Sequence, residues 1–212
     1  MFLSDNEYKR ALALIDGAIE PEPPLTELTE WVRNTFGITI YDYICDTTSA
    51  GLNRLRLVVW DESYRNALMD GMNYDRKKQR IIGEKFAELA KKHRLPRQYR
   101  SADGFFVCCD TVSDQIMGKA LAAARDEICA LEGGDVVRIC IFFASVHIFY
   151  QTDAQIAQHA EDGQSELLRR RIIDTARKHD RFDLLEKGLS FVFTSQQTLD
   201  EKYGGKLFFY WR

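Results

Sequence analysis

The sequence predicts an α+β protein built from two repeated units, each with the element order helix, strand, strand, helix, strand. Apolar residues alternate between the three-to-four-residue spacing of helices and the two-residue spacing of strands. A set of marker residues occurs twice in the same order, between Asp61 and Cys109 and between Asp153 and Phe193. The chain has 212 residues, 45% of them hydrophobic, which suffices for one large domain or two small ones. We expect largely antiparallel sheets covered by helices.

The marker residues are an Asp, an Asp-Gly pair, an Arg-Ile-Ile run, a Lys-His pair and a strand-like apolar run. The first set is Asp61, Asp70–Gly71, Arg80–Ile82, Lys92–His93 and Gly104–Cys109, and the second is Asp153, Asp162–Gly163, Arg171–Ile173, Lys178–His179 and Gly188–Phe193. The spacing from Asp to Gly is the same in both sets. One interpretation of the repeated markers is an internal duplication. The other is that two similar segments share these residues by chance.

Residues 1–24 are predicted to form an acidic helical arm followed by a proline linker. Ser4 and Glu7 have the spacing of a capping box, in which each residue accepts a hydrogen bond from the backbone of the other. The run Glu20–Pro24 contains three prolines, which restrict the backbone to extended conformations. We interpret this arm as an addition to the first unit.

The first unit, residues 25–112, is predicted to contain two long helices and three strands. Gly37 ends the first helix, and Leu95–Pro96 ends the second. In the second helix, Ile81, Ile82 and Phe86 begin an apolar stripe. The expected elements are helices over 25–36, 63–71 and 74–94, and strands over 38–46, 54–61 and 105–111.

The second unit, residues 113–212, is predicted to repeat this order. The expected elements are helices over 116–131, 153–160 and 165–179, and strands over 136–143, 146–152, 189–195 and 206–211. The two units are expected to pack as one body. From Gly104 to Ser195 the element order also permits a ferredoxin-like sheet.

The chain ends in the aromatic run Phe208–Trp211 followed by Arg212. An apolar strand at a terminus has to enter a sheet or meet a partner, because its backbone groups otherwise lack hydrogen-bond partners. Burial in the sheet is the favoured interpretation. If the strand instead lies at an exposed edge, it predicts a homodimer formed by strand addition.

Charge is unevenly distributed. Between Met1 and Glu30 there are seven acidic and two basic residues, whereas between Asp75 and Arg100 there are ten basic and three acidic residues. The predicted binding residues are Arg76, Lys77, Lys78, Arg80, Lys91, Lys92, Arg94, Arg97, Arg169, Arg170 and Arg171. These cations can simply form a solvated helix face with no binding role. The alternatives are that they bind an acidic protein partner, the chain's own N-terminal arm, or nucleic acid. The net charge of −3 disfavours nucleic acid.

No catalytic residue, metal site or cofactor is predicted. The sequence lacks the nucleophile-elbow, phosphate-loop, zinc-protease and dinucleotide motifs. Its five cysteines include no CxxC pair, so buried free thiols are expected. Of the four histidines, His93 and His179 are expected to end helices, His147 to lie in a strand, and His159 to have the carboxylates of Glu161 and Asp162 nearby.

We therefore expect a non-enzymatic, cytoplasmic binding protein, of which an immunity or antitoxin protein and an adaptor are concrete versions. The start of the chain does not resemble a secretory leader, and no apolar run approaches the ~20 residues that cross a bilayer, so no membrane association is expected. Two alternatives remain. One is a nucleic-acid-binding module using residues 75–100, and the other is an enzyme with a site between the units, built from Asp61, Asp153, His93 and His179. For Asp61 and Asp153, capping of the helices that follow them is the favoured interpretation. Asp42 and Asp46 form a further carboxylate cluster without an identified partner.

Overall fold

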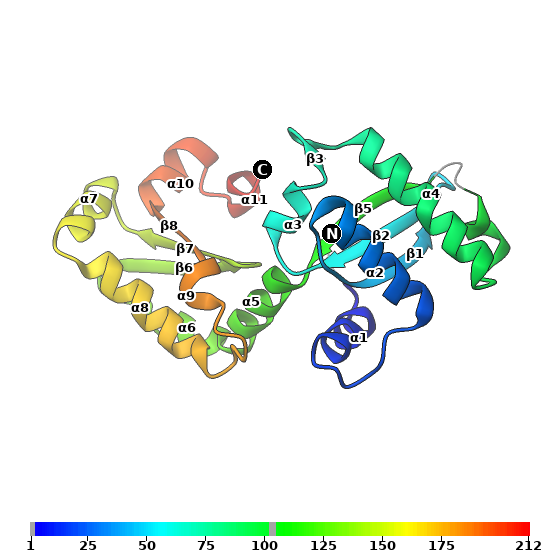
Figure 1. The fold of residues 1–212 in the computed structure, drawn as a ribbon. Coiled ribbons are helices and arrows are strands. Elements are labelled where there is room, and N and C mark those ends of the chain that lie inside the picture. Colours follow the sequence, from blue (N-terminus) through cyan, green and yellow to red (C-terminus); the bar gives the residue numbers. More distant parts are fainter. Residues whose placement is uncertain (1–2, 102–104) are drawn as a thin grey trace. The chain divides into compact units, whose positions relative to one another are not determined.

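The computed structural model describes residues 3–101 and 105–212, and the chain divides into unit 1, Met1–Ser113, and unit 2, Asp114–Arg212 (Figure 1). The predicted mixture of helices and small, mostly antiparallel sheets is confirmed: three of the five strand pairings within these residues are antiparallel. The marker Gly104 lies outside the described residues. No helix in the described ranges has the length and apolarity that a membrane-spanning segment needs.

Unit 1 contains a three-stranded sheet in the order β1 (Ile40–Thr47), β2 (Asn53–Val59), β5 (Phe106–Thr111). β1 and β2 form the predicted antiparallel hairpin, and β5 runs parallel to β2. A parallel neighbour requires a long crossover connection. That connection contains one of the long helices that cover the sheet.

The crossover from β2 to β5 contains more and shorter elements than predicted. Its elements are α3 (Glu62–Asn66), the two-residue strands β3 (Met69–Asp70) and β4 (Asn73–Tyr74), α4 (Arg76–Lys92) and the short 3-10 helix η1 (Arg97–Arg100). The expected helix over 63–71 therefore stops at Asn66, and a small hairpin that turns at Gly71, with φ 60°, follows it.

One face of this sheet packs against α2 (Pro23–Phe36) and α4. Leu55, Leu57 and Val59 of β2 point into this core, together with Phe86 of α4. Ile81 was predicted on the same stripe of α4 but is 38% exposed, because it lies a quarter of a turn away from the buried Ile82. The apolar stripe is therefore narrower than predicted.

The other face of the sheet is polar, because side chains of a strand alternate between its two faces. Helix α1 (Asp5–Ile15) lies against this face and contacts β1. The predicted capping box is confirmed: the side chain of Ser4 accepts from the Glu7 backbone, and the side chain of Glu7 accepts from the Ser4 backbone. The N-terminal arm is thus docked within unit 1.

Unit 2 contains a second three-stranded sheet in the order β6 (Val136–Phe142), β7 (Ser145–Tyr150), β8 (Ser190–Ser195). β6 and β7 are antiparallel, and β8 runs parallel to β7. Because β5 pairs with β2 in unit 1, the four strands between Gly104 and Ser195 do not form one sheet, and the ferredoxin-like arrangement is wrong. Both units share strand order and direction, but duplication stays a prediction, since such small sheets can arise independently.

Helices cover both faces of the second sheet, and Figure 1 shows α8 and α10 on opposite sides of it. The helices are α5 (Val112–Ala123), α6 (Arg125–Cys129), α7 (Asp153–Glu161), α8 (Gln164–Arg177), α9 (Leu185–Gly188), α10 (Gln196–Tyr203) and α11 (Leu207–Tyr210). The single helix expected over 116–131 breaks at Ala124 into α5 and α6. Ile172 and Ile173 of α8 are buried in the core, as are Leu121 of α5 and Ile148 of β7.

The strand predicted over 206–211 is wrong, because this segment forms the short helix α11. Gly204 and Gly205 adopt positive φ values of 60° and 72° and redirect the chain after α10. The aromatic side chains then find partners without strand pairing: Tyr210 Oη lies 2.8 Å from His147 Nδ1, and the ring of Trp211 stacks on Phe142 at 4.9 Å. The edge strand on which the predicted homodimer depended does not form.

We expect Phe86→Ala to destabilise unit 1 by about 3–5 kcal/mol, since it removes a fully buried ring. That ring packs against Tyr43 at 5.1 Å and Phe105 at 5.6 Å. Ile81→Ala on the same helix should cost less than about 1 kcal/mol. Urea denaturation followed by tryptophan fluorescence measures both, and equal costs would contradict the assigned burial.

Candidate functional sites

The exposed face of α4 carries a row of cations. Arg76, Lys77, Arg80 and Lys91 project within about 100° of one another around the helix axis, opposite the buried face. Arg76, Lys77 and Lys91 form no ion pair within the described residues, and Arg80 reaches only Glu84, at 4.0 Å. We call these four residues the basic stripe.

The other predicted binding residues near α4 fall into two groups. Lys78 and Lys92 have structural partners: Lys78 Nζ donates to the carbonyl of Ala67 at 2.8 Å, and Lys92 Nζ lies 2.7 Å from Glu27. Arg94 and Arg97, beyond the helix end, are exposed. The stripe with these two arginines is therefore the accessible part of the cluster.

The three arginines predicted as binding residues on α8 have different partners. Arg169 bonds Glu166 at 3.1 Å, and its guanidinium lies 5.5 Å from the ring centroid of Phe191. Arg170 also bonds Glu166, at 3.1 Å. Only Arg171 of the three forms no ion pair with the described residues. On α8, therefore, one of the three predicted arginines is in no ion pair, whereas on α4 three of the four stripe cations are in none.

An open hollow of about 750 Å³ adjoins the start of the basic stripe. Arg76 and Lys77 line it together with the carboxylates of Asp70 and Asp75. Its apolar lining includes Met72, which is 96% exposed. The hollow thus combines both signs of charge with accessible apolar surface.

A second polar group, which we call the charged sheet face, consists of Asp42, Asp46, Arg54, Arg56 and Asp110. Arg56 Nε donates to Asp110 Oδ2 at 2.7 Å, and both side chains are 5% exposed or less. Arg54 holds Asp46 with two hydrogen bonds, of 2.7 and 2.6 Å. Sequence reasoning found Asp42 and Asp46 but no partner for them. The alternating run Arg54-Leu55-Arg56-Leu57 was the signal, because it puts both arginines on one face of β2.

Helix α1 covers the charged sheet face through two ion pairs. Glu7 lies 3.1 Å from Arg56, and Arg10 lies 3.4 Å from Asp42. Burial raises the pKa of Asp42, and the charge of Arg10 opposes this rise. One oxygen of Asp42 has no hydrogen-bond partner among the residues described. Docking of α1 therefore gives Arg56 and Asp42 charged partners, but it leaves one oxygen of Asp42 without a hydrogen bond among the described residues.

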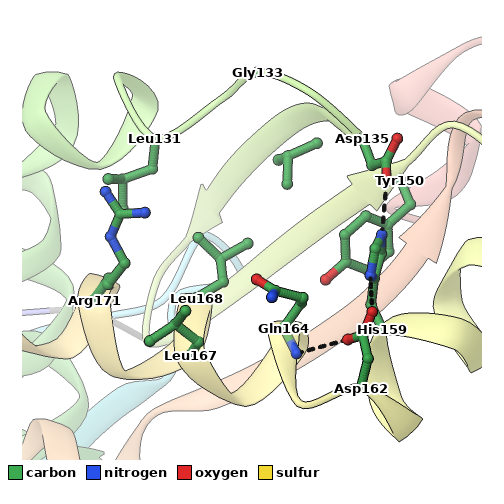
Figure 2. A pocket seen from close by; sticks show the side chains of 11 residues that line it. Leu131, Gly133, Asp135, Tyr150, His159, Asp162, Gln164, Leu167, Leu168 and Arg171 are labelled. Atoms are coloured by element: carbon green, nitrogen blue, oxygen red, sulfur yellow. Dashed lines mark hydrogen bonds and ion pairs between the residues drawn. The ribbon is translucent and has the colours of Figure 1, made fainter.

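Unit 2 contains a group of polar side chains around His159, of which sequence reasoning noted the carboxylate of Asp162 but not that of Asp135 (Figure 2). The ring of His159 lies between two carboxylates, with Nε2 2.9 Å from Asp135 and Nδ1 3.1 Å from Asp162. Burial lowers the pKa of His159, but hydrogen bonds and charge from Asp162 and Asp135 outweigh it and raise the pKa overall. The ring also packs at 4.9 Å against Tyr150, whose hydroxyl lies 2.9 Å from Ser165 Oγ.

This group forms one end of a cavity of about 410 Å³, which we call the His159 pocket. Figure 2 shows Asp135, His159 and Asp162 at one end and Arg171 with Leu131 at the other. The remaining lining residues are Gly133, Val136, Tyr150, Gln164, Leu167 and Leu168. Sequence proximity indicated Asp162, but Asp135 lies 24 residues from His159 and is brought close by the fold.

The residues of the enzyme alternative have structural partners inside their own units. Asp61 caps α3 as predicted, accepting from the backbone of Ser63 and Tyr64. The predicted capping by Asp153 is wrong: Thr152 caps α7, and Asp153 accepts instead from the hydroxyls of Ser195 and Thr198. His93 ends α4 and bonds Glu27 at 2.9 Å, while His179 follows α8.

The cysteines are free, as expected, but only Cys108 and Cys109 are buried, whereas Cys45, Cys129 and Cys140 are half-buried. Burial raises the pKa of Cys45 to about 12 and that of Cys108 to about 11, so these thiols stay protonated near neutral pH. Within 3–101 and 105–212, no three His, Cys, Asp or Glu side chains are placed to hold a metal ion.

No family model, curated protein or solved structure matches this chain. Its function is therefore argued from its own residues.

We expect Arg56→Met to destabilise unit 1 by about 3–5 kcal/mol, since it leaves the carboxylate of Asp110 buried without its counter-charge. Arg54→Met, which breaks a more exposed pair with Asp46, should cost about 1 kcal/mol or less. Adding Asp110→Leu to Arg56→Met should recover part of the loss. Urea denaturation of the three variants tests this, and a double variant no more stable than Arg56→Met would contradict it.

We expect the His159 ion pairs to stabilise unit 2 less as pH rises above the ordinary histidine pKa of 6.5. The folded-state pKa of His159 is raised above its ordinary value of 6.5, so its ion pairs stabilise the fold fully below that value and are lost as the ring deprotonates. His159→Gln should flatten this part of the profile of thermal midpoint against pH. His179→Gln, at an exposed position, should retain the wild-type slope, and identical slopes for all three proteins would refute the assignment.

Proposed function

We propose that this chain is a binding protein that recognises an acidic surface of another protein through the basic stripe, Arg76, Lys77, Arg80 and Lys91. The observation that carries the proposal is a set of four cations along about 22 Å of one helix face, three of which form no ion pair with the described residues. The opposite face of α4 is packed into the core. The stripe is thus presented on a rigid support, which reduces the entropy lost on binding.

The hollow beside the stripe favours a protein over a nucleic acid. Asp70 and Asp75 lie beside Arg76 and Lys77 and would repel a phosphate backbone there. The exposed Met72 suits an apolar side chain of a protein partner. We therefore expect an acidic segment that places one apolar side chain in the hollow.

Two tyrosines near the stripe form hydrogen bonds within unit 1, which disfavours their stacking on the bases of a nucleic acid. Tyr74 Oη accepts from the backbone nitrogen of Cys109 at 3.0 Å, and Tyr99 Oη donates to the carbonyl of Cys45 at 3.3 Å. Both rings are half-buried in unit 1. Splaying them out for a base would break these bonds. An immunity, antitoxin or adaptor role needs only that the stripe cover a complementary surface.

We expect Arg76→Glu with Arg80→Glu to weaken binding of the partner at least tenfold, since each reversal replaces attraction by repulsion across the interface. Chemical cross-linking in extracts at native expression identifies the partner, and titration with the purified pair measures affinity at about 50 and 300 mM salt. The matched control is a Lys202→Glu variant, with an exposed cation reversed on α10 of unit 2. Unchanged affinity in the reversed variant, or binding only to RNA or DNA in gel shifts, would refute the proposal.

A further inference from the structure

We propose that the His159 pocket binds a short peptide with free termini, about three residues long, whose ammonium group meets Asp135 and whose carboxylate meets Arg171. This inference concerns unit 2 and is independent of the basic stripe. It follows from the placement of charge, the apolar surface between the charges, and their separation.

The two ends of the pocket carry opposite charge. At one end, Asp135 and Asp162 surround a single imidazole, so this group has a net charge of −1 when the ring is protonated. At the other end, Arg171 contributes a guanidinium without an ion-pair partner in the described chain. A ligand that satisfies both ends must carry a cation and an anion.

The carboxylates at the acidic end are not equally available. Asp162 binds His159 through one oxygen and the backbone nitrogen of Gln164 through the other, at 3.1 and 2.9 Å. Asp135 binds His159 through Oδ2 at 2.9 Å, and its Oδ1 has no hydrogen-bond partner among the described residues. Asp135 Oδ1 is therefore the acceptor for the ligand's ammonium group.

Helix α8 sets the distance between the ends. Gln164, Leu167, Leu168 and Arg171 follow the i, i+3, i+4, i+7 spacing and share one face of the helix, which lines the pocket. The first and last of these are polar, and the two leucines lie between them. At a rise of 1.5 Å per residue, Gln164 and Arg171 are about 10 Å apart along the axis. Figure 2 shows the acidic end beyond Gln164, so 10 Å is the minimum backbone separation that the ligand and the long side chain of Arg171 span together.

This separation selects the length of the ligand. An extended peptide spans about 3.3–3.6 Å per residue, so about three residues separate an ammonium from a carboxylate by 10 Å. A single amino acid carries both charges on one carbon and cannot reach both ends. The leucines favour an apolar middle side chain, and Figure 2 shows the Gln164 side-chain amide between the ends, where it can bond the peptide backbone.

The test is isothermal titration of the full chain with the tripeptide Ala-Leu-Ala and its capped forms. We expect submillimolar affinity for the free peptide, with N-acetylation and C-amidation each weakening binding at least tenfold. Arg171→Gln should weaken binding of the free peptide to the same extent as C-amidation does. It should leave the affinity of the amidated peptide unchanged, because amidation and the substitution remove the same contact between the carboxylate and Arg171. The matched control is Arg170→Gln, the adjacent α8 arginine outside the pocket, which should bind like the wild type.

Three outcomes would overturn the proposal. These are no binding of Ala-Leu-Ala up to about 5 mM, equal affinity for free and capped peptides, and equal affinity for leucine alone. If Arg171→Gln does not fold, the amidated peptide with the wild-type chain tests the same contact. Chemical shifts of the His159 ring that move only with the free tripeptide would support the assigned position.

Discussion

The buried guanidinium of Arg56 connects four elements of unit 1. It bonds Asp110 of β5 at 2.7 Å and Glu7 of α1 at 3.1 Å, and lies 3.7 Å from Asp46 of β1. A charge that is 5% exposed is tolerated only with such partners, so the position of each element is constrained by it. A slip of β2 by one residue would put Leu57 on this face and move the arginine into the apolar core. The ion pairs thus specify the register that the hydrophobic core also requires.

The two sheets share a topology, but different segments of the chain cover the second face of each. In unit 1 that face is charged and lies beneath the N-terminal helix α1. In unit 2 it is aromatic and meets the C-terminal segment, where Tyr210 contacts His147 and Phe149, with a 5.3 Å centroid distance to the latter. The functional surfaces differ too. In the stripe on α4 only Arg80 forms an ion pair with the described residues, at 4.0 Å from Glu84, whereas α8 pairs Arg169 and Arg170 with Glu166 and leaves one arginine at a pocket.

Local patterns located much of the fold and part of each candidate site. Periodicity found α4 and α8, because a helix buries residues three and four apart whatever it packs against. It also placed the cations of the basic stripe on one helix. It could not separate Lys92, which is paired with Glu27, from Lys91, which forms no ion pair in the described chain, since that depends on where α2 lies. The His159 pocket was missed for the same reason, because Asp135, just before β6, and His159 of α7 come together only in the folded chain.

The sequence by itself determined the α+β class, the two hairpins, the capping box of Ser4 and the segregation of charge, because each depends on residues near one another along the chain. Tertiary structure decided the partners of β5 and β8 and the state of the C-terminal segment. β5 pairs with β2 in unit 1 instead of joining β6–β8, a choice between sheets that no local pattern encodes. The segment 206–211 has the aromatic composition of a strand, yet it forms a helix because its side chains are satisfied by packing on β6 and β7. Contacts between residues distant along the chain outweigh local preference there.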